Sequence, residues 1–210
     1  MSDLSGLAVF LNYAAVAFFA LTGALTAARR GYDIVTFCFF AAATGLGGGS
    51  LRDVLLGVPV FWIQQPTYLA LCIAAAGAVW AVGERPWRFL ALLWLDAVGL
   101  AVYGVVGAAK AADLGAPPLT AVVMGVLTAS FGGVIRDILA NEPSVLLRRE
   151  IYITCAVVGS GAFVALKLMG IDPATAAAIG VTAGFALRAG ALRYGWALPA
   201  FRRDEDQDYK

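Results

Sequence analysis

The sequence contains no histidine among its 210 residues, so it lacks the commonest metal ligand and general base of proteins. Its three cysteines, Cys38, Cys72 and Cys155, lie singly within apolar runs and do not have the spacing of a metal site. We interpret these thiols as small buried apolar side chains. We therefore expect no catalytic residues, no resident metal and no other cofactor, and the sequence does not favour an enzyme.

Charged residues are also scarce, at 14% of the chain, whereas a soluble domain usually carries about 25%. Apolar residues reach 61%, and the net charge of +1 without a basic tract gives no indication of nucleic acid binding. The 24 glycines and long alanine runs suit helices that pack closely in lipid. The composition predicts an all-α membrane protein, with membrane lipids as its surroundings.

Seven segments are apolar enough to cross a bilayer as helices, which takes about 20 residues each. The N-terminus begins Met-Ser-Asp, without the positive region of a signal peptide, so we expect the first segment to be retained. The expected spans are 7–28, 33–57, 67–83, 88–109, 117–140, 151–168 and 173–192.

The distribution of basic residues predicts the orientation, because cytoplasmic loops of membrane proteins are rich in lysine and arginine. Lys110 and Lys167 are the basic residues expected on one side of the membrane. The other side holds Arg29, Arg30, Arg85, Arg88, Arg148, Arg149, Arg193, Arg202, Arg203 and Lys210. We therefore predict an inner (plasma) membrane protein with its N-terminus outside and its C-terminus in the cytoplasm.

The chain carries an internal duplication. Residues 44–57 read TGLGGGSLRDVLLG and residues 128–141 read TASFGGVIRDILAN, with six of fourteen positions identical at an offset of 84. Each copy holds three spans, an odd number, so the second copy must enter the membrane from the opposite face, as in channels and transporters. The predicted parts are repeats over 1–83 and 84–168, a seventh helix over 169–193 and a polar tail over 194–210.

Glycines interrupt the second span and the fifth span at matching places. Because each glycine weakens a helix interior by about 1 kcal/mol relative to alanine, they predict a kink or an unwound turn. The alternative is that they permit a close helix crossing. The residues concerned are Gly47, Gly48, Gly49, Gly132 and Gly133.

Four charged residues follow these glycines inside the expected spans: Arg52, Asp53, Arg136 and Asp137. Charges at membrane depth are costly and usually face a bundle interior or an aqueous pathway. Two interpretations remain open, a polar constriction or gate and a structural ion pair that locks the repeats together.

The expected topology indicates which of these groups meet. Asp96 in the fourth span lies near the level of Arg136, and its repeat counterpart Asn12 lies near the level of Arg52. We therefore predict that Arg136 pairs with Asp96 and that Arg52 meets Asn12.

Between the two polar clusters, hydroxyl and aromatic side chains border the midplane, where hydroxyls can replace part of an ion's hydration shell and rings can narrow a passage. Lys110, near the outer end of the fourth span, is either an interfacial anchor or an electrostatic filter, with the anchor slightly favoured. The candidate pore residues at the midplane are Phe19, Thr44, Tyr103, Thr128 and Ser130.

The motif GLGGGSLRDVLLGVPVFW (45–62) and its echo FGGVIRD (131–137) resemble the prokaryotic branch of the TRIC family, the trimeric intracellular cation channels. The resemblance implies a homotrimer in which each protomer has its own hourglass pore, permeable to potassium and other monovalent cations. It also implies that kinked helices 2 and 5, with helices 1 and 4, border that pore. The second copy departs from the first in carrying Ser130-Phe131 where the first has Leu46-Gly47.

Three functions are consistent with these features. A passive cation channel, with potassium or sodium as its transient occupant, is favoured because the sequence shows no obvious carboxylate at the midplane to couple ions to a solute. A transporter of a small neutral solute such as glycine is the alternative. The third is a membrane protein that conducts nothing.

Overall fold

The computed structural model describes residues 2–83, 88–147 and 151–199. Within these ranges the chain forms eight α-helices and one short 3-10 helix, arranged as a bundle. Some of the basic residues used above to predict the orientation, and most of the expected tail, lie outside the described residues: Arg85, Arg148, Arg149, Arg202, Arg203, Lys210 and the segment 200–210.

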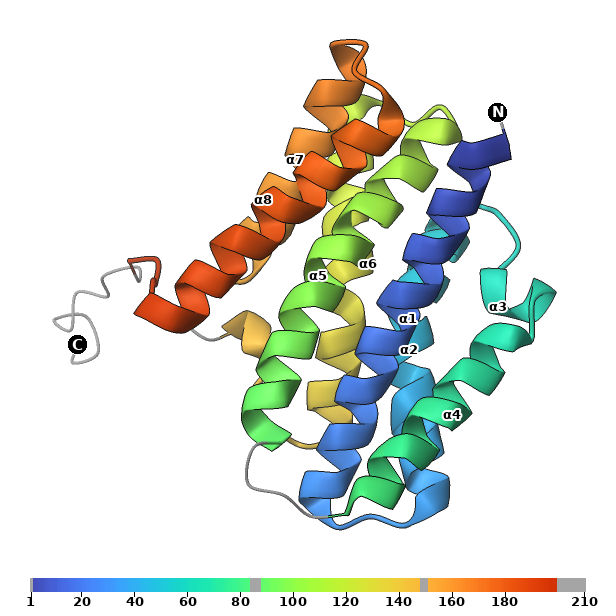
Figure 1. The fold of residues 1–210 in the computed structure, drawn as a ribbon, viewed down its shortest axis with the longest axis vertical. Coiled ribbons are helices and arrows are strands. Elements are labelled where there is room, and N and C mark those ends of the chain that lie inside the picture. Colours follow the sequence, from blue (N-terminus) through green and yellow to red (C-terminus); the bar gives the residue numbers. More distant parts are fainter. Residues whose placement is uncertain (1, 84–87, 148–150, 200–210) are drawn as a thin grey trace, which may run out of the picture.

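Four long helices form the middle of the bundle, and shorter or later helices flank them (Figure 1). Helices α7 and α8 lie on one side, while α3 and α4 lie on the other. The central helices are α1 (Ser2–Arg30), α2 (Ile34–Leu55), α5 (Arg88–Asp113) and α6 (Pro118–Leu139). The flanking elements are α3 (Phe61–Gln64), α4 (Thr67–Val82), η1 (Val145–Leu147), α7 (Ile153–Leu168) and α8 (Pro173–Tyr194).

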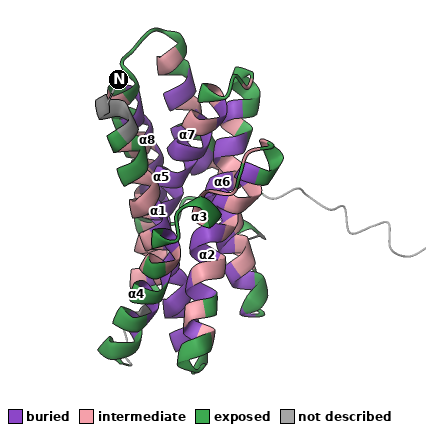
Figure 2. Ribbon diagram, turned by 90° about the vertical axis from the view of Figure 1, so that its right-hand side faces the viewer, coloured by how far each residue is buried: buried purple, intermediate pink, exposed green. Residues whose placement is uncertain are grey.

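Buried residues lie in the centre of the bundle, and exposed residues lie at its ends and outer faces (Figure 2). Many of the exposed residues are large and apolar. Phe10, Val35 and Leu119 are 66%, 75% and 76% exposed, which suits contact with lipid and is costly in water. Five helices, α1, α2, α5, α6 and α8, are long and apolar enough to cross a membrane. Helices α4 and α7 have 16 residues each and fall short of the usual 20, so the count of seven spans stays a prediction.

The two halves of the chain fold alike, as the duplication predicts. Helix α6 begins and ends 84 residues after α2, and η1 begins 84 residues after α3. The first helices of the two halves, α1 and α5, run in opposite directions (Figure 1). The N-terminal end of α1 consequently lies beside the C-terminal end of α5, where both line one cavity.

Candidate functional site

Helices α2 and α6 cross with their backbones in direct contact, and two glycines make this contact possible. A Cβ atom on Gly48 would lie 2.1 Å from the carbonyl oxygen of Thr128, and one on Gly132 would lie 2.4 Å from that of Thr44. The two contacts are counterparts in the repeat, so they form a nearly symmetric crossing point. The alternative interpretation of the glycines, a close crossing, therefore describes Gly48 and Gly132.

Both helices continue without interruption through their glycines. The prediction of an unwound turn in these two helices is therefore wrong, whereas the kink stays a prediction. The glycine penalty applies to an isolated helix, and here the close contact with the partner helix offsets it. At Gly47, Gly49 and Gly133 an added Cβ would meet neighbouring side chains.

Each Arg-Asp pair ends its helix in the same way. Arg52 Nε donates to Asp53 Oδ1 at 2.8 Å, and Asp53 Oδ2 accepts from the backbone N–H of Phe61 at 3.0 Å. Arg136 Nε donates to Asp137 Oδ1 at 3.0 Å, and Asp137 Oδ2 accepts from the N–H of Val145 at 2.8 Å. The aspartates thus hold the preceding arginine and begin the short helix that follows.

The cluster of Arg136, Asp137 and Asp96, called the inner cluster after the predicted orientation, confirms the predicted partner of Arg136. Arg136 Nη1 lies 2.8 Å from Asp96 Oδ1, and Asp137 contacts the same guanidinium from the other side. Arg136 and Asp96 are 1% and 2% exposed, so their charges are removed from solvent. Two carboxylates and one guanidinium in contact form a buried ion-pair cluster that joins α5 to α6, within the second repeat.

Sequence reasoning missed Arg188, which is completely buried on α8. Its guanidinium stacks 5.2 Å above the ring centre of Tyr152, and its Nη1 donates to the carbonyl of Ile151 at 3.2 Å. An arginine within the expected span 173–192 was the signal, because a charge in a span usually faces the protein interior. Arg188 ties α8 to the segment that leads into α7.

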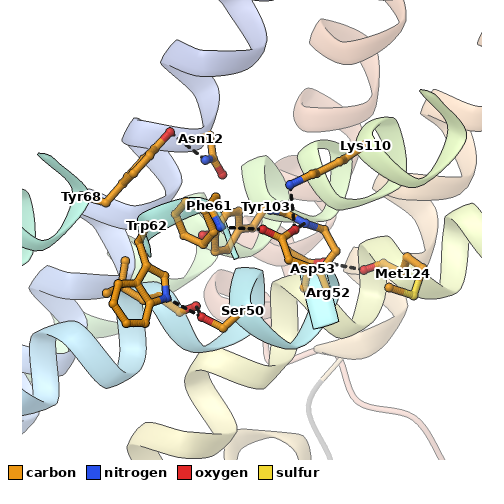
Figure 3. A network of polar contacts seen from close by, with 12 residues as sticks. Asn12, Ser50, Arg52, Asp53, Phe61, Trp62, Tyr68, Tyr103, Lys110 and Met124 are labelled. Atoms are coloured by element: carbon orange, nitrogen blue, oxygen red, sulfur yellow. Dashed lines mark hydrogen bonds and ion pairs between the residues drawn. The ribbon is translucent and has the colours of Figure 1, made fainter. Parts of the chain in front are cut away.

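The outer cluster, named in the same way, consists of Arg52, Asp53, Lys110 and Asn12 (Figure 3). It lacks one of the two acids that the inner cluster has. Asn12 stands where the second repeat has Asp96, and its Nδ2 donates to Tyr68 Oη at 2.9 Å. Arg52 and Asn12 line the same cavity, but Asn12 Oδ1 accepts no hydrogen bond from any described residue, so the predicted meeting is seen as a shared cavity and not as a hydrogen bond. Lys110 supplies the second cation, with Nζ 2.8 Å from Asp53 Oδ1. Lys110 turns into the protein and is therefore not an interfacial anchor.

The five candidate midplane residues are all buried in the core, each at most 4% exposed. The rings of Phe19 and Tyr103 lie 5.7 Å apart, and Tyr103 Oη donates to the carbonyl of Gly45. The hydroxyls of Thr128 and Ser130 donate to backbone carbonyls one turn earlier. The side chains at the expected midplane are tightly packed and form a closed constriction. The role of this constriction in a pore stays a prediction.

An outer cavity of about 520 Å³ lies on one side of this constriction. It is bordered by the N-terminal end of α1, the C-terminal ends of α5 and α7, and the start of α8. Its polar lining residues are Asn12, Arg52, Gln64, Gln65, Tyr68, Lys110, Asp113 and Lys167. None of the five midplane residues lines this cavity, so the packed core separates it from the inner cluster.

Comparison with known proteins places the chain among membrane proteins of one fold. A family model described as "Glycine transporter" matches residues 9–84 and again 93–168, two matches that start 84 residues apart. The UPF0126 inner membrane protein YadS of Escherichia coli K12 is 36% identical over 204 residues, covering 95% of this chain and 99% of its own length. A UPF0126 membrane protein of Vibrio cholerae is 37% identical over 88% of this chain and 79% of its own length.

Solved structures with the same fold are cation channels. The TRIC trimeric intracellular cation channel orthologue of Rhodobacter sphaeroides is 44% identical, with a TM-score of 0.87, over 90% of this chain and 99% of its own. A second structure, described in terms of conductance through TRIC cation channels, is 30% identical with a TM-score of 0.81, over 93% and 97% of the two chains.

Proposed function

Because this chain belongs to the prokaryotic branch of the TRIC family, we propose that it is a potassium-permeable cation channel with a pore in each protomer. The observation that carries the proposal is the match to the Rhodobacter sphaeroides channel, at 44% identity and a TM-score of 0.87. Potassium or sodium would be a transient occupant of the path. This assignment also supports the expectation that the protein is not an enzyme.

The proposed path follows the contact of α2 and α6, with α1 and α5 completing its wall. The outer cavity forms its outer vestibule, and the packed rings of Phe19 and Tyr103 with the hydroxyls of Thr44, Thr128 and Ser130 close it at the centre. The inner cluster lies at the cytoplasmic end of this path. Conduction then requires the α2–α6 crossing to rearrange, so we assign the gate to this crossing.

The proposal extends to the assembly of the protein and to its orientation in the membrane. We propose a homotrimer in the prokaryotic inner membrane, surrounded by lipid, with seven spans as two inverted repeats plus α8. The N-terminus would be outside and the C-terminus cytoplasmic. The similarity to a channel described as trimeric supports the homotrimer. The basic residues Arg29, Arg30 and Arg193 support the orientation.

A carrier of glycine is the second candidate, because the matching family model bears that description. The two functions differ in what limits the flux. A channel needs a continuous wet path, whereas a carrier needs an occluded site and alternating access.

Ion flux from proteoliposomes separates these candidates. Purified protein in vesicles loaded with potassium should release the ion down its gradient without saturating, and glycine should neither be required nor be taken up. Saturable uptake of labelled glycine without potassium flux would contradict the channel proposal and support the carrier.

Replacing Lys110 by glutamine should raise the potassium flux about twofold at low ionic strength, because a positive charge in a vestibule lowers the local cation concentration. Asp53 would keep Arg52 and the Phe61 N–H as partners, so the fold should remain. The gain should shrink as salt screens the charge. A flux that is unchanged at low salt would mean that Lys110 does not face the path.

A further inference from the structure

The outer cavity carries more positive charge than its acids balance. Arg52, Lys110 and Lys167 line it together with Asp113, and Asp53 lies against the first two cations. Asp113 pairs with Lys167 at the rim, which leaves Asp53 to balance both Arg52 and Lys110. Among the side chains that the structure describes, this leaves one positive charge in excess.

Two buried polar atoms beside the cavity have no hydrogen-bond partner among the described residues, Arg52 Nη1 and Asn12 Oδ1. Arg52 is 1% exposed, so its free N–H group has left solvent without a replacement. In the other repeat the matching atom, Arg136 Nη1, is held by Asp96 Oδ1 at 2.8 Å. Among the described residues, Arg52 therefore has one acidic partner, whereas its counterpart Arg136 has two.

We propose that the outer cavity binds a small hydroxycarboxylate, such as glycolate, as the missing partner of Arg52. The carboxylate accepts from Arg52 Nη1 and neutralises the excess charge, as Asp96 does for Arg136. The hydroxyl donates to Asn12 Oδ1, which a plain carboxylate leaves unpaired. The cavity of about 520 Å³ admits a molecule of this size. Binding requires no conduction, so this inference does not rest on the proposed channel function.

Isothermal titration of the purified full chain in detergent tests the proposal. Sodium glycolate, sodium acetate and glycine would be compared at constant ionic strength in low chloride. Glycolate should bind saturably and about fivefold more tightly than acetate, the effect of one neutral hydrogen bond. Glycine, which brings no net charge, should bind more weakly than glycolate. Glycine binding more tightly, or the same weak signal from chloride as from glycolate, would overturn the proposal.

Two substitutions at Asn12 separate the two contacts. Asn12→Asp places an acid where the second repeat has Asp96, so it should occupy Arg52 and weaken both carboxylates at least about tenfold. Asn12→Leu removes the acceptor Oδ1 and also the donor to Tyr68 Oη but adds no charge, so glycolate should fall to the affinity of acetate while acetate is unchanged.

Ser50→Ala serves as the control, because Ser50 bonds Trp62 and does not line the cavity. Circular dichroism would establish that each variant is folded. Glycolate binding that survives Asn12→Asp, or that is lost in Ser50→Ala, would overturn the assignment.

Discussion

Asp96→Asn should lower the free energy of unfolding by about 3 kcal/mol, because it leaves Arg136 buried with one acidic partner instead of two. Asparagine has the same shape as aspartate, so packing should change little and the loss should report the charge. Arg136 is 1% exposed and lies within a helix of the membrane bundle, where water cannot replace the lost carboxylate. Unfolding of the purified protein in mixed detergent micelles, followed by tryptophan fluorescence, measures this difference.

The same substitution at an exposed ion pair provides the control. Asp113 pairs with Lys167 at the rim of the outer cavity, and its side chain is 69% exposed. Asp113→Asn should therefore cost at most about 0.5 kcal/mol, as expected of a solvent-exposed pair. If Asp96→Asn were as mild as Asp113→Asn, the buried ion pairs of the inner cluster would not stabilise the fold.

The second large effect should come from Gly48→Ala at the crossing of α2 and α6. The added Cβ would lie 2.1 Å from the Thr128 carbonyl oxygen, and backbone atoms cannot move aside as a flexible side chain can. We expect a loss of about 3 kcal/mol, the upper part of the range for overpacking. Gly132→Ala should behave in the same way, because its contact with Thr44 is the counterpart in the repeat.

Gly77→Ala on α4 is the matched control, since nothing lies within 4 Å of the Cβ position. It should leave stability unchanged or raise it slightly, as alanine favours a helix over glycine. Thermal unfolding and potassium flux should be measured on all three variants. A Gly48→Ala variant with the stability and flux of the wild type would mean that the crossing is not as close as described.

The sequence predicts the features that depend on its repeat. The offset of 84 relates α2 to α6, and the expected depth of Asp96 identifies it as the partner of Arg136. The helix correspondence and the Arg136–Asp96 pairing both follow from the order and direction of the helices, so predicting them requires no knowledge of side-chain conformation. The inverted order of the copies likewise follows from an odd number of spans.

Features that depend on side-chain reach could not be predicted in this way. Lys110 lies 57 residues from Asp53, and its long side chain could equally have extended to the membrane surface. The glycines predict a weak point in an isolated helix, whereas the structure uses Gly48 and Gly132 for contact with a neighbour. Tertiary packing therefore decides between two outcomes that the local pattern leaves open.

Single-channel recording in planar bilayers tests the central claim, that this protein conducts cations through a path within each protomer. With unequal potassium chloride on the two sides, we predict discrete unitary currents that reverse near the potassium equilibrium potential. The Lys110→Gln variant should show larger unitary steps in the same recording. Silent bilayers containing folded protein, or currents that reverse at the chloride potential, would contradict the claim.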